Sequence, residues 1–146
     1  MKDEANIING ERVQKVSEML AIIDWNWLTS ATQSRFHGDF ILDNIIKTAE
    51  GYKLIDWRQD FGGLMSAGDM YYDLAKLYGG LIIPYNKIKK NLFTFKQESH
   101  CVQIDIEYPK YLDLARREFV EFVEKWGYDY KKIRLLTGII FINMSP

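Results

Sequence analysis

The first regular pattern of apolar residues lies near the N-terminus. Four apolar residues recur there at steps of three and four positions: Val13, Val16, Leu20 and Ile23. This spacing places side chains on one face of an α-helix. The pattern therefore predicts an amphipathic helix from Glu11 to Asp24, which ends close to Trp25.

Two short apolar runs follow an irregular stretch. Residues 44–47 and 52–56 are separated by Thr48-Ala49-Glu50-Gly51, a sequence typical of a turn. These runs predict a small β-hairpin. Its first arm begins at Asn44, and its second arm carries Asp56 at its end.

The second half of the chain alternates helical and strand patterns. Asp69 is a suitable N-cap for a helix that carries Leu74 and Leu81, and Pro84 opens a further short helix. Strict alternation at 102–107 predicts a half-buried strand that pairs with residues 93–96. Residues 109–126 and the segment from about residue 129 are predicted to be helical. The fold class is therefore α+β, mainly helical.

Composition limits the classes of protein. The chain has 146 residues, 47% of them hydrophobic, which suits one compact domain over residues 1–146. Its 19 basic and 20 acidic side chains form no basic stripe, so we expect no nucleic-acid partner. No apolar run is long enough to cross a bilayer, and a single cysteine, Cys101, suits a reducing compartment. We expect a cytoplasmic protein without a membrane partner.

The residues with chemical potential lie in one stretch, His37-Gly38-Asp39-Phe40-Ile41-Leu42-Asp43-Asn44, followed by an apolar strand and Asp56. Phosphoryl transfer to a hydroxyl requires a carboxylate that accepts the hydroxyl proton, and oxygen ligands that hold Mg²⁺ against the phosphates. Asp39 and Asn44 stand five residues apart, as in the kinase catalytic loop. The stretch thus offers all the groups that this reaction needs.

At these residues the chain resembles the aminoglycoside phosphotransferase and choline kinase family, whose members carry H-G-D-x-x-x-x-N and then I-D-W or I-D-F. Residues 68–75 resemble the family's G-D-P-x-x-D-L-A segment, with Met70 in place of the proline. The resemblance extends over residues 11–130, and its specific motifs lie between His37 and Ala75.

The resemblance implies roles for five residues. Asp39 is then the catalytic base, Asn44 and Asp56 bind Mg²⁺ and through it ATP, and His37 and Asp73 support the catalytic loop. It implies transfer of the γ-phosphoryl group of ATP to a small hydroxyl compound such as an amino alcohol, a sugar or an aminoglycoside. The implied fold is the C-terminal lobe of a protein-kinase-like fold.

One other motif competes for the metal. Asp60-Phe61-Gly62 spells the D-F-G of protein kinases. We favour Asp56, because Leu54 and Ile55 precede it as an apolar strand, whereas polar residues precede Asp60.

The resemblance does not include the N-terminal lobe that clamps the nucleotide in such kinases. Only 36 residues precede His37, and they contain a single glycine, Gly10, so there is no room for a nucleotide-clamping N-lobe. We expect a fragment that is inactive alone and that associates with the missing lobe or with a second copy of itself. The alternative is a kinase-derived binding or assembly module without catalysis.

Overall fold

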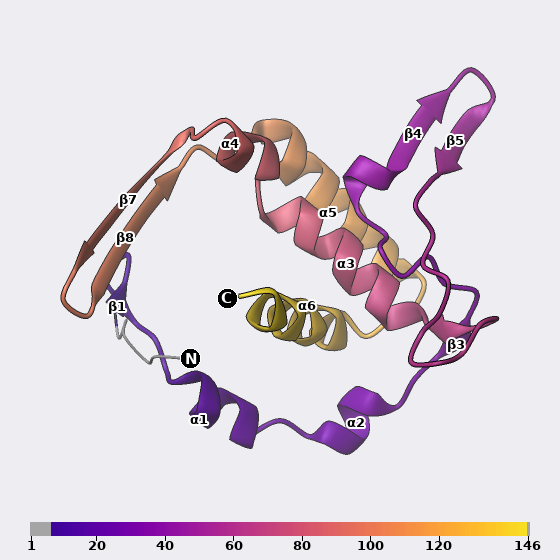
Figure 1. The fold of residues 1–146 in the computed structure, drawn as a ribbon, viewed down its shortest axis with the longest axis horizontal. Helices are drawn as coiled ribbons and strands as arrows, with labels where there is room; N and C mark the ends of the chain where they lie inside the picture. The colour runs from indigo at the N-terminus through magenta and orange to yellow at the C-terminus, as the bar shows by residue number, and fades with distance from the viewer. Residues whose placement is uncertain (1–6, 146) are drawn as a thin grey trace.

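Three helices form the centre of the molecule. The computed structural model describes residues 7–145. In it α3 (Met70–Ile82) packs against α5 (Lys110–Lys125) and α6 (Tyr130–Met144). Two β-hairpins extend from this centre on opposite sides of the view in Figure 1. The predicted α+β class with mainly helical content is confirmed.

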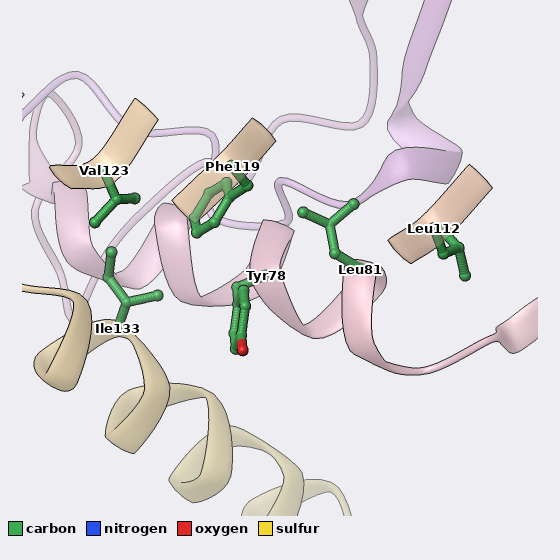
Figure 2. Close-up of a cluster of buried hydrophobic side chains, with 6 residues drawn as sticks. All are labelled: Tyr78, Leu81, Leu112, Phe119, Val123 and Ile133. Atoms are coloured by element: carbon green, nitrogen blue, oxygen red, sulfur yellow. The ribbon is translucent and has the colours of Figure 1, made fainter. Parts of the chain in front are cut away.

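The core lies where these helices meet. Figure 2 shows its six buried side chains, which come from all three helices: Tyr78, Leu81, Leu112, Phe119, Val123 and Ile133. Val123 and Ile133 are completely buried. Burying a large aliphatic side chain contributes about 1.5–3 kcal/mol, so this cluster fixes α3 in place. The α3 residues outside this cluster are then available to hold the candidate site.

Aspartates cap the N-termini of α3 and α6, where the sequence predicts that helices begin. Asp69 is the N-cap of α3, and its carboxylate accepts a hydrogen bond from the Tyr71 N–H (3.1 Å). Asp129 caps α6 in the same way through the Lys132 N–H (3.1 Å). Each cap satisfies a backbone donor that the helix leaves unpaired. The predicted starts of both helices are confirmed.

Both predicted hairpins are confirmed, but the prediction of a half-buried strand at 102–107 is wrong, because Ile104 is exposed and only Val102 and Ile106 are partly buried. β4 (Ile45–Thr48) pairs with β5 (Gly51–Leu54), and β7 (Phe93–Glu98) pairs with β8 (Cys101–Ile106), both antiparallel. The short helix α4 (Tyr85–Lys89) follows Pro84, as predicted.

The predicted helix from Glu11 to Asp24 is wrong. Ile7–Ile8 (β1) and Glu11–Arg12 (β2) form a hairpin instead, and β1 joins β8 in a sheet of order β2-β1-β8-β7. The turn between them is Asn9-Gly10, with φ of 51° and 82°. Asn-Gly favours such a two-residue turn because both positions need positive φ.

The rest of that segment forms two short helices, α1 (Val16–Ala21) and α2 (Trp25–Thr29). They separate at Asp24, whose carboxylate accepts a hydrogen bond from the Trp27 N–H (3.1 Å) and so begins α2. No side chain of α1 is buried. The apolar spacing alone therefore had no packing partner to support one long helix.

A buried lysine ties α2 to the centre. Lys132 on α6 is only 3% exposed, and its ammonium donates hydrogen bonds to the carbonyl oxygens of Trp27 and Ser30 at the end of α2. Beyond α2, β3 (Gln33–Ser34) pairs with β6 (Gly68–Asp69) directly before α3. The segment between β3 and β6 contains most of the candidate site. Among residues 7–145, no helix combines the length and the apolar character that crossing a bilayer demands.

Candidate active site

Asp73 anchors the loop that begins at His37. Asp73 lies in the first turn of α3, and its two carboxylate oxygens accept hydrogen bonds from the backbone N–H groups of His37 (2.6 Å) and Gly38 (2.8 Å). Hydrogen bonds to a charged acceptor are stronger than those between neutral groups. The start of the loop is therefore fixed to the helix that packs against both α5 and α6.

Gly38 lets the loop pass close to a neighbouring segment. Its φ is +78°, and a Cβ atom at this position would lie 2.6 Å from the Cβ atom of Arg58. The Arg58 N–H donates a hydrogen bond to the His37 carbonyl oxygen (2.9 Å). Only glycine fits both the conformation and the space.

His37 lies beneath the loop and is 3% exposed. Its Nδ1 accepts a hydrogen bond from the Asp39 N–H (3.3 Å), and its ring lies 4.7 Å from that of Trp57. Its Nε2 is buried and has no hydrogen-bond partner among the described residues. The side chain thus contacts the loop backbone and an aromatic ring, which is a supporting position.

Asn44 faces Asp39 across the loop. Asn44 is buried at the end of a 3-10 turn, Leu42–Asn44. Its Nδ2 donates hydrogen bonds to the backbone oxygen of Asp39 (2.9 Å) and to the carboxylate Oδ2 of Asp39 (3.3 Å). Because these bonds fix the orientation of the amide, Oδ1 of Asn44 points away from Asp39 and is left for another ligand.

Asp56 is attached to the same loop by bonds on both sides of it. The Ile55 N–H donates to the Asn44 carbonyl oxygen (3.1 Å), and the Arg58 N–H donates to that of His37. Asp56 itself has a φ of +59°, the left-handed region, and is exposed. A non-glycine residue in this region is uncommon and points to local constraint. The backbone pairing places Asp56 beside Asn44.

These residues fit a magnesium site that is completed by a ligand. Among residues 7–145, no three histidine, cysteine, aspartate or glutamate side chains gather closely enough to bind a metal ion on their own. Mg²⁺ in nucleotide sites takes only one or two protein ligands, together with phosphate oxygens and water. The free amide oxygen of Asn44 and the exposed carboxylate of Asp56 match that need.

The structure adds a residue that the sequence reasoning missed. Nζ of Lys76 lies 2.7 Å from Oδ1 of Asp39, and the two side chains are 12% and 26% exposed. Lys76 lies three residues after Asp73 on α3, so the same face of this helix holds the loop at two points. The three-residue step from Asp73 to Lys76 is the sequence feature that indicates a shared helix face.

A pocket opens beside Asp39. Its volume is about 330 Å³, within the range of small-molecule sites. The walls come from the loop and from α3 to α6, and include Asp39, Lys76, Gly80, Ile83, Leu112 and Phe141. A small molecule in this pocket would lie against the Asp39 carboxylate.

Asp60 lies elsewhere. It is exposed, and its carboxylate accepts a hydrogen bond from the Gly63 N–H (2.9 Å) in a tight turn. Phe61 packs its ring edge-on against Phe36 and Tyr72. The Asp60-Phe61-Gly62 segment therefore has local bonds of its own, and none of the hydrogen bonds described here connects Asp60 to the loop.

This arrangement agrees with a comparison against known families. A family model described as the phosphotransferase enzyme family matches residues 3–97. The chain belongs to the phosphotransferase enzyme family. The resemblance predicted from His37–Asn44, Asp56 and residues 68–75 is confirmed. No curated protein and no solved structure matches the chain.

The phosphotransferase match covers one side of the pocket only. It includes the loop, the β4–β5 hairpin, α3 and α4, whereas α5 and α6 lie beyond residue 97. All the candidate site residues are therefore inside the matched segment. Much of the pocket wall lies outside it, including Leu112 and Phe141.

Proposed function

We propose that the chain is the acceptor-side lobe of an enzyme that transfers the γ-phosphoryl group of ATP to a hydroxyl of a small molecule. The observation that carries the proposal is the position of the Asp39 carboxylate, which is bonded to Asn44 and lines the pocket. Family membership supports phosphotransfer in general. The acceptor and the nucleotide are our inference.

The proposed step starts with the acceptor in the pocket and its hydroxyl against Asp39. The hydroxyl oxygen forms a bond to the γ-phosphorus of ATP, and the bond from that phosphorus to the β,γ-bridging oxygen breaks. The hydroxyl proton passes to the Asp39 carboxylate. The products are a phosphate monoester and ADP.

Asn44 and Asp56 are the residues that would hold Mg²⁺. The Asn44 amide is oriented for this by its two bonds to Asp39, and the backbone at Asp56 is held beside the loop by the bonds of Ile55 and Arg58. When bound, Mg²⁺ neutralises charge on the phosphates during transfer.

Lys76 positions the base. Its ammonium balances the charge of Asp39 through Oδ1, while Oδ2 lies toward Asn44. Holding a carboxylate from two sides restricts its rotamers, which keeps it aimed at the acceptor hydroxyl.

We also propose that the described residues form the acceptor side of a two-lobe kinase-like fold. The catalytic loop, the β4–β5 hairpin and the helical centre supply a base, metal ligands and a pocket. A second lobe that clamps the nucleotide phosphates would complete the enzyme.

The experiment compares Asp39→Asn with Asp105→Asn, an exposed control on β8. Both are tested in the chain and in a fusion that adds a nucleotide-clamping lobe, with an ADP-release assay. Loss of the base should lower transfer about 10²- to 10⁴-fold and leave nucleotide binding intact, because the base acts mainly in the transition state. Undiminished transfer by Asp39→Asn in the active protein would refute the proposal.

A further inference from the structure

Resting on the proposed function, we infer the class of acceptor: an alcohol whose hydroxyl is carried by an uncharged, largely apolar body. The inference excludes polycations such as aminoglycosides as preferred acceptors. It rests on three properties of the pocket beside Asp39: its floor is apolar, it is wide at Gly80, and its lining charges are paired.

The floor of the pocket is apolar. Its buried lining residues are Ala75, Gly79, Gly80, Pro84, Leu112 and Thr137. The only polar side chain among them has its hydroxyl occupied, because Oγ1 of Thr137 lies 3.0 Å from the Ala75 oxygen and 2.9 Å from the Ile133 oxygen. Its methyl group, in contrast, faces Gly79. A ligand that reaches the floor therefore meets carbon atoms.

Two glycines of α3 give the pocket its width. Each glycine inside a helix costs about 0.5–1 kcal/mol relative to alanine. At Gly79 a Cβ atom would lie 3.1 Å from the Phe141 ring, so close packing explains that residue. At Gly80 the nearest atom would be Leu42 Cγ at 3.7 Å, an ordinary contact. Packing does not require glycine at 80, and its main effect is open space in the pocket.

The charges that line the pocket are already paired. They are Asp39, Asp43, Lys76 and Lys89. Lys76 lies 2.7 Å from Asp39, and Lys89 lies 2.7 Å from Asp43. No carboxylate among the described lining residues is left for a cationic ligand. The Lys76–Asp39 pair is 12% and 26% exposed and the Lys89–Asp43 pair 63% and 58%. An ammonium group that entered the pocket as far as Asp39 would have to displace Lys76 or stay without a partner, which is costly.

The uncharged polar side chains of the pocket, apart from Thr137, lie at its rim. Tyr85, Asn86 and Tyr111 are exposed lining residues with one hydroxyl or amide each. A polar rim over an apolar floor suits a ligand with one polar end. The hydroxyl of such a ligand would lie at Asp39 and its apolar body over Gly79 and Gly80.

The first test is direct binding to the 146-residue chain, measured by calorimetry and saturation-transfer NMR. The probes are 4-phenylbutan-1-ol, 4-aminobutan-1-ol, glucose and kanamycin. Burial of the phenyl group should make the neutral alcohol bind about tenfold or more tightly than the other three. Tighter binding of the amino alcohol, glucose or kanamycin would overturn the inference.

A pair of variants at one position locates the binding. Gly80→Leu fills the space above the floor, whereas Gly80→Ala adds a single methyl group at an ordinary contact distance. We expect the leucine variant to lower the affinity for 4-phenylbutan-1-ol about tenfold or more, and the alanine variant to change it less than about threefold. Circular dichroism checks that both variants fold. An unchanged affinity in a folded Gly80→Leu protein would contradict the proposed location.

A second pair tests the charge argument. Lys89→Met leaves Asp43 unpaired at the pocket, whereas Lys90→Met removes an exposed charge from a residue that does not line it. The first change should raise the affinity for 4-aminobutan-1-ol about threefold or more, and the second should not. Equal effects of the two changes would count against charge pairing as the source of selectivity.

The transfer assay separates this inference from the proposed function. Transfer to sugars or amino alcohols without transfer to 4-phenylbutan-1-ol would overturn the acceptor class and leave the phosphotransferase intact. Pocket-dependent binding of 4-phenylbutan-1-ol without transfer to any acceptor in the completed enzyme would instead overturn the function, and the acceptor role with it.

Discussion

Asp73 and Gly38 set the shape of the loop that begins at His37, at the scale of single residues. One carboxylate receives two consecutive N–H groups, and one glycine lets Arg58 approach. The Asp and Asn spacing in the sequence was enough to locate this loop. The pairing of Asp39 with Lys76 was not predicted, because a lysine on an amphipathic helix is usually solvated. The three-residue step from Asp73 to Lys76 indicates a shared helix face but does not identify Asp39 as the partner.

Gly38→Ala tests the close approach, and Gly10→Ala is a matched control. Both glycines have φ near +80°, but a Cβ atom at Gly10 would meet no atom within 4 Å. The control should lose about 1–2 kcal/mol of unfolding free energy from the left-handed conformation alone. Gly38→Ala should lose about 1–3 kcal/mol more, because Arg58 must move. Urea unfolding measures the loss of unfolding free energy in both variants. Equal losses would show that the Arg58 side chain moves aside without a cost in free energy.

At the scale of elements, the helices and hairpins that the sequence predicted correctly carry strong end signals. Asp69 and Asp129 are N-caps, and the Thr48–Gly51 turn joins β4 to β5. The prediction of one N-terminal helix was wrong because apolar spacing outweighs turn-forming residues only where the helix has a packing partner. Asn9-Gly10 specified a hairpin and Asp24 began a new helix, so apolar spacing alone was a weaker guide there.

The contact between α3 and α6 predicts a pH dependence. Burial, with a 2.7 Å hydrogen bond to the Tyr130 hydroxyl, raises the pKa of Tyr78 from 10.0 to about 12. Above pH 10 the unfolded chain loses this proton while the folded chain keeps it. The resulting stabilisation is complete below pH 10 and is lost as the pH rises toward about 12.

Urea unfolding over this range checks the expectation, with Tyr78→Phe as the comparison. The variant should be less stable at neutral pH, because it lacks the hydrogen bond. It should also lose stability less steeply in alkali than the wild type. If the unfolding free energy of the two proteins fell equally steeply with pH, Tyr78 would not be the source of the pH dependence.

At the scale of the whole molecule, the N-terminal segment leaves apolar side chains exposed. Met19, Ile22 and Trp25 are 38%, 79% and 47% exposed. Trp27, in contrast, donates from its ring nitrogen to Asp129 (3.0 Å). These residues lie close together in the sequence, and exposed apolar patches tend to be covered by a partner. We therefore expect self-association through α1 and α2.

Sedimentation equilibrium of the wild type, Ile22→Lys and Asn26→Lys tests this expectation. Both changes add the same charge at exposed positions, but only the first removes an apolar side chain. Ile22→Lys should weaken association about tenfold, while Asn26→Lys should have little effect. A wild type that stays monomeric at high concentration would contradict the expectation.

The central claim is that Asp39, Asn44 and Asp56 form one phosphotransfer site, and metal-dependent nucleotide binding tests it most directly. Mn²⁺ replaces Mg²⁺ as a spectroscopic probe, and the affinity for Mn·ATP is measured by electron paramagnetic resonance in the fusion that adds a nucleotide-clamping lobe. Asp56→Asn should weaken binding about tenfold or more, because a metal ligand is lost.

Asp39→Asn and Asp60→Asn should retain Mn·ATP affinity to within about twofold, since Asp39 acts on the acceptor and the Asp60 carboxylate caps a turn. Loss of binding in Asp60→Asn together with unchanged binding in Asp56→Asn would contradict the account.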